Sequence, residues 1–207
     1  MKPLIKICGI SSLEAAQTAE QAGATFIGLN FIPIARHFIS TEKAQEIVAG
    51  FGPTKKVRVV GVFQNQSLKE IEEIITTVPL DMVQLHGEES PEFCNRISVP
   101  IIKALALASE FDVQETQKLM SSYQVEMYLL DRLKQGEGKV LDWFRVKKLA
   151  EEFPLLLAGG LNPENIHAAL TAARPLGADV ASGIETEGLE DLDKIKRFIQ
   201  LAQTAIV

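Results

Sequence analysis

The sequence predicts an α/β protein folded as a single (β/α)8 barrel over residues 1–207, on the strength of three observations. Short apolar runs rich in β-branched residues alternate with longer amphipathic stretches along the whole chain. The runs are continuously apolar, which is typical of parallel strands buried on both faces. Eight strand–helix units fit this length, as in a minimal TIM barrel. A doubly wound open sheet is the alternative, but it leaves the eightfold count unexplained.

The expected strands are these eight apolar runs. They lie at residues 4–8, 25–31, 57–63, 81–87, 99–105, 126–131, 154–160 and 178–184. Between them, the stretches 11–23, 40–51 and 67–78 read as helices because each begins with Ser or Thr and carries Glu about three residues later, as in a capping box. Gly23 supplies a helix stop. No linker, low-complexity stretch or charge block interrupts the pattern, so we expect one domain.

Composition limits the partners. A hydrophobic content of 46% with 23% charged residues is typical of a soluble globular protein. A formal charge of -6 argues against nucleic acid or an anionic membrane as partner. We expect a cytoplasmic protein, because no apolar run has membrane-spanning length and the N-terminus lacks the features of a signal peptide. The two cysteines, Cys8 and Cys94, fit no metal-ligand or disulfide spacing, and Cys94 reads as core.

Several polar residues stand where the predicted strands end. In a barrel of parallel strands the chemistry gathers at this rim. The residues concerned are Cys8, Gln84, His86, Asp131 and Asp179. A thiol, an imidazole and two carboxylates that converge on one rim predict a functional site. Gln84 and His86 are candidate substrate-binding residues, and the alternative of satisfied polar groups in the upper barrel layer stays open.

The ends of the last two strands predict a phosphate site. Gly159 and Gly160 precede a helix whose start we place at Asn162, and Ser182 with Gly183 repeat the pattern one strand later. Glycines let backbone N–H groups approach an anion, and a helix N-terminus favours negative charge. Barrels frequently bind phosphate after strands seven and eight. The alternative is a pair of tight turns.

Taken in order, "KICGI", "QLHGEE", the Asp of "LLD" with "GEGKVLDW", "GGLNPENI" and "DVASGIE" resemble the phosphoribosylanthranilate isomerase family. The resemblance runs from the first strand to the last helix. It implies an Amadori rearrangement of the small molecule N-(5-phosphoribosyl)anthranilate in tryptophan biosynthesis, with no metal or organic cofactor. It matches Asp131 to the general acid and Cys8 to the general base, and it places Asp179 near the anthranilate amine.

The same residues allow a second reading of Asp179. Lys6 shares the parity of Cys8, so it should also face the barrel interior, where a buried ammonium needs a partner. In a closed barrel the last strand lies beside the first, so we expect Lys6 to pair with Asp179, and both roles are compatible. Glu88 and Glu89 read as a solvated helix start.

Three positions depart from the family pattern. His37 stands where the family has the Arg that binds the anthranilate carboxylate, with Arg36 one place earlier. The loop at 132–139 is shorter than in many members, and Glu190 replaces a usual Lys. We expect Arg36 to take the carboxylate and His37 to be at most a secondary contact, because a guanidinium pairs with a carboxylate better than an imidazole does.

Two other function classes stay open. One is a different phosphosugar barrel enzyme, such as indoleglycerol phosphate synthase or a ribulose-phosphate epimerase, but the catalytic lysines, glutamates or metal ligands of those enzymes do not stand out. The other is a barrel that binds a phosphosugar or a protein without catalysis, for which the altered loop after the second strand is the support.

Overall fold

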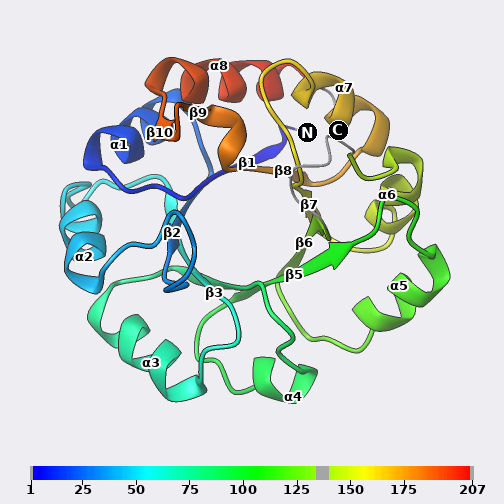
Figure 1. The fold of residues 1–207 in the computed structure, drawn as a ribbon, viewed down its shortest axis with the longest axis horizontal. Coiled ribbons are helices and arrows are strands. Elements are labelled where there is room, and N and C mark those ends of the chain that lie inside the picture. The colour runs from blue at the N-terminus through cyan, green and yellow to red at the C-terminus, as the bar shows by residue number, and fades with distance from the viewer. Residues whose placement is uncertain (1, 134–139, 206–207) are drawn as a thin grey trace.

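The computed structural model describes residues 2–133 and 140–205. Within them, eight parallel strands pair in chain order and close into a barrel, with the helices in a ring outside it (Figure 1). The predicted (β/α)8 barrel is therefore confirmed. In the same part of the chain, none of the helices combines the length and apolar character that a membrane crossing needs. The predicted short loop at 132–139 falls mostly outside the described residues.

The strands occupy the predicted runs with small differences at their ends. Their bounds are β1 Leu4–Cys8, β2 Phe26–Asn30, β3 Arg58–Phe63, β4 Met82–Leu85, β5 Ile101–Leu107, β6 Met127–Arg132, β7 Leu155–Leu157 and β8 Gly177–Val180. The runs predicted at 154–160 and 178–184 were too long, because Gly159 and Gly160 adopt positive φ and residues Ser182–Ile184 form a 3-10 turn, η1. These turns begin the loops at the barrel mouth.

The first three helices begin at the Ser residues that the sequence predicted as caps or directly beside them. The bounds of the helices are α1 Leu13–Ala22, α2 Thr41–Ala49, α3 Leu68–Thr77, α4 Pro91–Cys94, α5 Val113–Met120, α6 Trp143–Ala150, α7 Ile166–Ala173 and α8 Leu192–Gln203. The side chains of Ser12, Ser40 and Ser67 each accept a backbone N–H in the first turn of α1, α2 and α3. Gly23 ends α1 with φ 98°, which a residue with a side chain rarely adopts. A short hairpin, β9 Glu185–Thr186 with β10 Leu189–Glu190, was not predicted.

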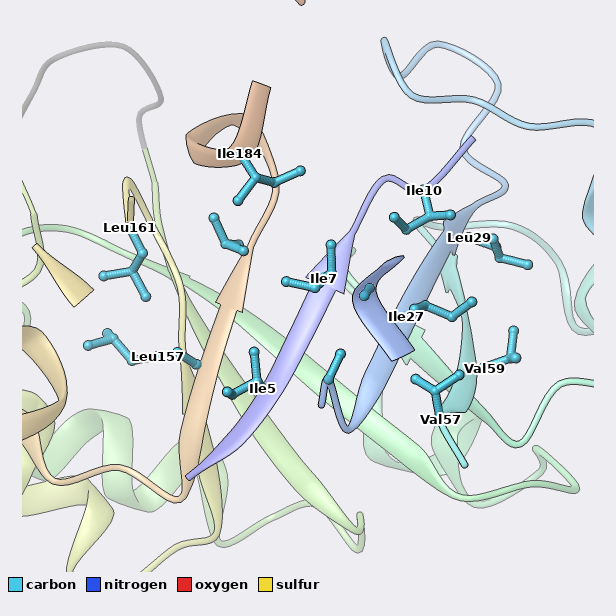
Figure 2. Packing of buried hydrophobic residues seen from close by; sticks show 14 of the residues in the cluster. Ile5, Ile7, Ile10, Ile27, Leu29, Val57, Val59, Leu157, Leu161 and Ile184 are labelled. Carbon is cyan, nitrogen blue, oxygen red and sulfur yellow. The ribbon is translucent and has the colours of Figure 1, made fainter. Parts of the chain in front are cut away.

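Successive side chains of β1 point alternately outward, into the core beneath the helices, and inward, into the barrel. Ile5 and Ile7 are buried on the outer face, beside Ile27 of β2 (Figure 2). Lys6 and Cys8 have the opposite parity and face inward. Parallel pairing places Lys6 opposite Asp179 where β1 meets β8, so the seam of the barrel carries two charged side chains.

A second buried ion pair holds the loop after β4. Lys103 Nζ on β5 lies 2.8 Å from Glu89 Oε2, and both side chains are 1% exposed. Lys103 also donates to the carbonyl oxygens of Leu85 and Gly87, at 3.3 and 2.7 Å. Glu89 in turn accepts the N–H groups of Asn65 and Gly87. The prediction of a solvated Glu89 was wrong, because its carboxylate has turned inward to meet this ammonium, whereas Glu88 is exposed as expected.

Lys103→Met should destabilise the fold by about 3–5 kcal/mol, because it leaves the Glu89 carboxylate buried without its cation. Denaturant unfolding measures this loss. Lys43→Met is the matched control, since Lys43 pairs with Glu46 on the surface of α2, and it should cost less than about 1 kcal/mol. Equal losses for the two variants would show that the buried pair does not hold the loop.

Candidate active site

The barrel mouth collects polar residues from strands that are far apart in sequence. Because all eight strands are parallel, their C-terminal ends meet at one rim. Cys8 ends β1, Asp131 lies near the end of β6, and His86 follows β4. Each predicted strand-end residue therefore lies on this rim or just inside it. Among the described residues, no group of three or more His, Cys, Asp or Glu side chains is arranged to hold a metal ion.

Lys6, Cys8 and Asp179 form the interior part of the site. Lys6 Nζ lies 2.8 Å from Asp179 Oδ1, with the Lys6 side chain fully buried, so the predicted pairing is confirmed. The neighbouring residue on β2 is Gly28, which lies opposite Cys8 in the strand register. A Cβ atom there would come within 2.8 Å of Cys8 Sγ and 2.9 Å of Lys6 Nζ. The glycine thus leaves the space in which the thiol and the ammonium meet.

These contacts act in opposite directions on the Cys8 thiol. Burial raises the pKa of Cys8, and Lys6 lowers it by stabilising the thiolate. The Asp179 carboxylate raises it again, and the net result is a pKa above the ordinary value. For Lys6, burial favours the neutral amine, but Asp179 and Cys8 outweigh it and raise the pKa of Lys6, which therefore stays protonated.

On the opposite side of the mouth, Asp131 lies next to His86. His86 Nε2 is 3.5 Å from Asp131 Oδ2, and the backbone N–H of Arg132 donates to Asp131 Oδ1 at 2.7 Å. His86 Nδ1 lies 3.1 Å from Nε2 of Gln84, whose side chain is buried inside the barrel. Gln84, His86 and Asp131 thus form a chain of contacts from the interior to the rim. Of the two residues predicted at the end of β4, His86 contacts the predicted acid and Gln84 contacts His86.

The two glycine-containing loops lie against each other. A Cβ on Gly183 would overlap the carbonyl oxygen of Leu161, so the loop after β8 packs directly on the loop after β7. Gly159 and Gly160 have φ 86° and 80°. The helix does not start at Asn162 as predicted, because a turn comes first: the Asn162 side chain accepts the N–H of Asn165, and α7 begins at Ile166.

Arg132 is a rim residue that the sequence reasoning missed. A Cβ on Gly159 would come within 2.7 Å of Arg132 Cγ, and one on Gly160 within 2.9 Å of its Cζ. The guanidinium therefore lies across the predicted phosphate loop. The signal was its place directly after Asp131, at the end of β6, but nothing in the sequence indicated which way the side chain turns.

Arg36 and His37 both bind one carboxylate from the far end of the chain. Arg36 Nη2 lies 2.9 Å from Glu185 Oε2, and His37 Nε2 lies 3.0 Å from Glu185 Oε1. The Glu185 side chain is 8% exposed, whereas that of Arg36 is 59% exposed. The His37 ring packs against Gly9, next to Cys8. Glu185 was not predicted, because it belongs to the hairpin that sequence patterns did not indicate.

Glu190, the third departure from the family pattern, lies at the same edge of the site. Its carboxylate accepts the backbone N–H of Ser11 at 2.6 Å and the hydroxyl of Ser12 at 2.8 Å. Ser12 is the N-cap residue of α1. Glu190 therefore fastens the hairpin to the loop that follows Cys8, a position where a negative charge at a helix N-terminus is favourable.

Comparisons with known proteins agree on one family. Residues 5–201 match the family model described as N-(5'phosphoribosyl)anthranilate (PRA) isomerase. An N-(5'-phosphoribosyl)anthranilate isomerase from Dehalococcoides mccartyi is 40% identical, over 97% of this chain and 95% of that protein. The one from Desulforudis audaxviator is also 40% identical, over 98% of this chain and 99% of its own length.

Solved structures give the same result. The phosphoribosyl anthranilate isomerase from Thermotoga maritima superimposes with a TM-score of 0.87 at 37% identity, covering 98% of this chain and 99% of that one. A further structure, with a TM-score of 0.85 and 36% identity over 98% and 99% of the two chains, is an isomerase in complex with reduced 1-(o-carboxyphenylamino)-1-deoxyribulose 5-phosphate.

Alkylation of Cys8 by iodoacetamide should speed up with pH and reach half its maximal rate at a higher pH than an ordinary exposed thiol does, because the pKa of Cys8 is raised. The reason is that burial outweighs the effect of Lys6. Asp179→Asn should move this midpoint to lower pH, because it removes a charge that disfavours the thiolate. Mass spectrometry in a Cys94→Ala background measures the rate. Asp193→Asn, on the exposed first turn of α8, should leave the midpoint unchanged. A midpoint in the unsubstituted protein below that of an ordinary exposed thiol would show that burial does not raise the pKa of Cys8.

Proposed function

The chain belongs to the N-(5'-phosphoribosyl)anthranilate isomerase family and is an aldose–ketose isomerase of tryptophan biosynthesis, and we propose that Cys8 and Asp131 are its catalytic base and acid. Its substrate is N-(5'-phosphoribosyl)anthranilate, and its product is 1-(2-carboxyphenylamino)-1-deoxyribulose 5-phosphate. The observation that carries the assignment is the placement of one thiol and one carboxyl group on opposite sides of a single barrel mouth, at the ends of β1 and β6.

The rearrangement needs two proton transfers. Asp131 gives its proton to the ring oxygen of the sugar while the bond between that oxygen and C1 breaks, which leaves a protonated Schiff base at C1. The cation acidifies the C2 proton, and the Cys8 thiolate removes it to form the enolamine, which tautomerises to the ketone. A positioned acid and base each contribute about 10²–10⁴ to the rate of such steps.

The surroundings of Cys8 favour its role as base. Its raised pKa makes the thiolate a minor form at neutral pH, and the Lys6 ammonium stabilises that form. The Schiff base brings a second positive charge next to the thiol, which lowers its pKa further at the moment when the base is needed. Asp179 holds Lys6 in place at 2.8 Å and, on the family resemblance, also contacts the anthranilate amine.

The phosphate is proposed to bind between the loops after β7 and β8. Gly159, Gly160 and Asn162 line one side, and Ser182 with Gly183 lines the other. Support comes from the positive φ of the first two glycines, which turns the backbone sharply, and from the close packing of the two loops. Fixing the phosphate there orients the sugar toward Asp131 and Cys8.

Arg36 is the proposed ligand of the anthranilate carboxylate. A guanidinium has five N–H donors, so it can bind Glu185 and a substrate carboxylate together. A neutral imidazole whose Nε2 donates to Glu185 presents only a lone pair at Nδ1, which repels a carboxylate. His37 is therefore a secondary contact that packs beside Gly9 and supports the loop.

The remaining assignments are proposals of the same kind. Residues 1–207 form one domain, supported by the pairing of β1 with β8, which uses the first and last strands of the barrel in a single closed sheet. The protein works in the cytoplasm, supported by the need to keep the Cys8 thiol reduced for catalysis. The comparisons do not favour a different phosphosugar enzyme or a non-catalytic barrel.

Cys8→Ala and Asp131→Asn should each lower kcat by about 10²–10⁴ while the folded protein still binds a product analogue. Steady-state and single-turnover assays with N-(5'-phosphoribosyl)anthranilate measure the effect. Cys94→Ala and Asp193→Asn are the matched controls, because neither residue lies on the rim, and both should keep the original kcat. A near-normal kcat in either rim variant would remove that residue from the mechanism.

Arg36→Ala should raise KM by about tenfold or more, because it removes a charge-assisted pair with the substrate carboxylate, whereas His37→Ala should raise KM only a few-fold. Both variants are assayed between about pH 6 and pH 8.5. If His37 were the ligand, the KM of the unsubstituted protein would rise with pH as the imidazole loses its proton. A strong effect of His37→Ala together with a silent Arg36→Ala would reverse the assignment.

A further inference from the structure

We propose that His86, held by Gln84, is the proton relay that recharges Asp131 after each turnover, rather than a ligand of the substrate. The proposal rests on the proposed role of Asp131 as the general acid. It assigns Gln84 and His86 as positioning and relay residues that act through Asp131.

The geometry places Gln84, His86 and Asp131 in sequence from the barrel interior to the rim. The His86 backbone is fixed by its N–H bond to the Phe63 carbonyl at 2.8 Å. Its ring Nδ1 is 3.1 Å from the Gln84 amide, and its Nε2 is 3.5 Å from Asp131 Oδ2. The His86 side chain is 25% exposed and that of Asp131 13% exposed, so the imidazole is the more accessible of the two to water.

The surroundings of Gln84 indicate why an amide is buried here. In the strand register its neighbours are Val62 of β3 and Ile102 of β5, which offer no polar side chain. A buried amide without a partner is costly, and the His86 ring supplies the contact that the neighbouring strands do not offer. Gln84 is therefore placed to orient His86.

The amide suits either tautomer of the imidazole. With Gln84 Nε2 against Nδ1, Oε1 is buried and has no hydrogen-bond partner among the described residues. Rotating the amide by half a turn brings Oε1 against Nδ1, where it accepts a hydrogen bond from an Nδ1–H group. Nδ1 thus has the Gln84 amide as its hydrogen-bond partner in both tautomers. Nε2, which faces Asp131, is the nitrogen that exchanges protons.

The proton balance closes over one turnover. Asp131 becomes a carboxylate when its O–H bond breaks and the sugar ring oxygen gains the proton. The Nε2–H bond of the His86 imidazolium then breaks as the O–H bond of Asp131 forms again, and the imidazole regains a proton from water. Cys8 releases to water the proton that it took from C2. One proton enters and one leaves, so no other reactant is needed.

The decisive experiment is chemical rescue of His86→Ala. We expect kcat to fall by about tenfold or more with KM changed less than about twofold, since the substrate contacts remain. Added imidazole should restore kcat in proportion to its concentration, whereas sodium chloride at equal ionic strength should not. The double variant His86→Ala/Asp131→Asn should show no rescue, because the acceptor of the proton is gone.

Two further variants separate the relay from a structural role. Gln84→Met should lower kcat with little change in KM, because the ring loses its orientation. Gln64→Met is the matched control: the Gln64 amide lies 3.5 Å from the His86 carbonyl oxygen but does not contact the ring, so kcat should stay the same. His86→Gln keeps a polar side chain without an exchangeable ring proton, and it should be slow even if His86→Ala fails to fold.

The outcomes distinguish the relay from the reaction itself. If the unsubstituted protein has no isomerase activity, the proposed function has failed. If it is active, three results overturn the relay: a normal kcat in His86→Ala or His86→Gln, a change confined to KM, or a slow His86→Ala that imidazole does not restore.

Discussion

The ion pair between Lys6 and Asp179 is the interaction on which both the barrel and its proposed chemistry depend. It joins the first strand to the last, at the seam where the sheet closes. A fully buried ammonium is tolerated only with such a partner, so the pair and the closure require each other. The same ammonium lies beside Cys8 and stabilises the thiolate form. The Lys6 ammonium therefore both stabilises the closed barrel and stabilises the thiolate form of the proposed base.

Around this pair, the outer faces of the strands pack against the helices, whereas the inner faces line the barrel interior and hold the residues of the site. The outer face, with Ile5 and Ile7, packs against the helices and supplies most of the apolar burial (Figure 2). The inner face has its own apolar cluster, which includes Phe26 and Met82, and it also carries polar side chains such as Lys6 and Gln84. Because the two faces alternate residue by residue, a polar group such as Gln84 occupies the interior without disturbing the outer packing.

Much of this was predictable from sequence because it depends on local pattern. The strand–helix rhythm, the Ser caps and the parity of Lys6 and Cys8 follow from neighbouring residues, and eightfold closure then implied the pairing of Lys6 with Asp179. Glu89, Glu185 and Arg132 were missed or misplaced for the opposite reason. Their side-chain directions depend on loops that come together only in the folded protein. No local sequence pattern indicates which distant charged residue pairs with a carboxylate in such a loop. The order of motifs, by contrast, identified the family without any of these contacts.

Glu185 follows directly after the turn that holds Ser182 and Gly183, and it forms ion pairs with Arg36 and His37 in the loop after β2, two strands away around the barrel. Under the proposed assignments, one short segment thus contributes to the phosphate site at one end and contacts the ligand of the substrate carboxylate at the other. The substrate is in effect bidentate, with two anionic ends bridged by a sugar and an aromatic ring. Once one end is bound, the other faces its receptor at a high effective concentration, so the whole molecule gains a chelate advantage that neither half has alone.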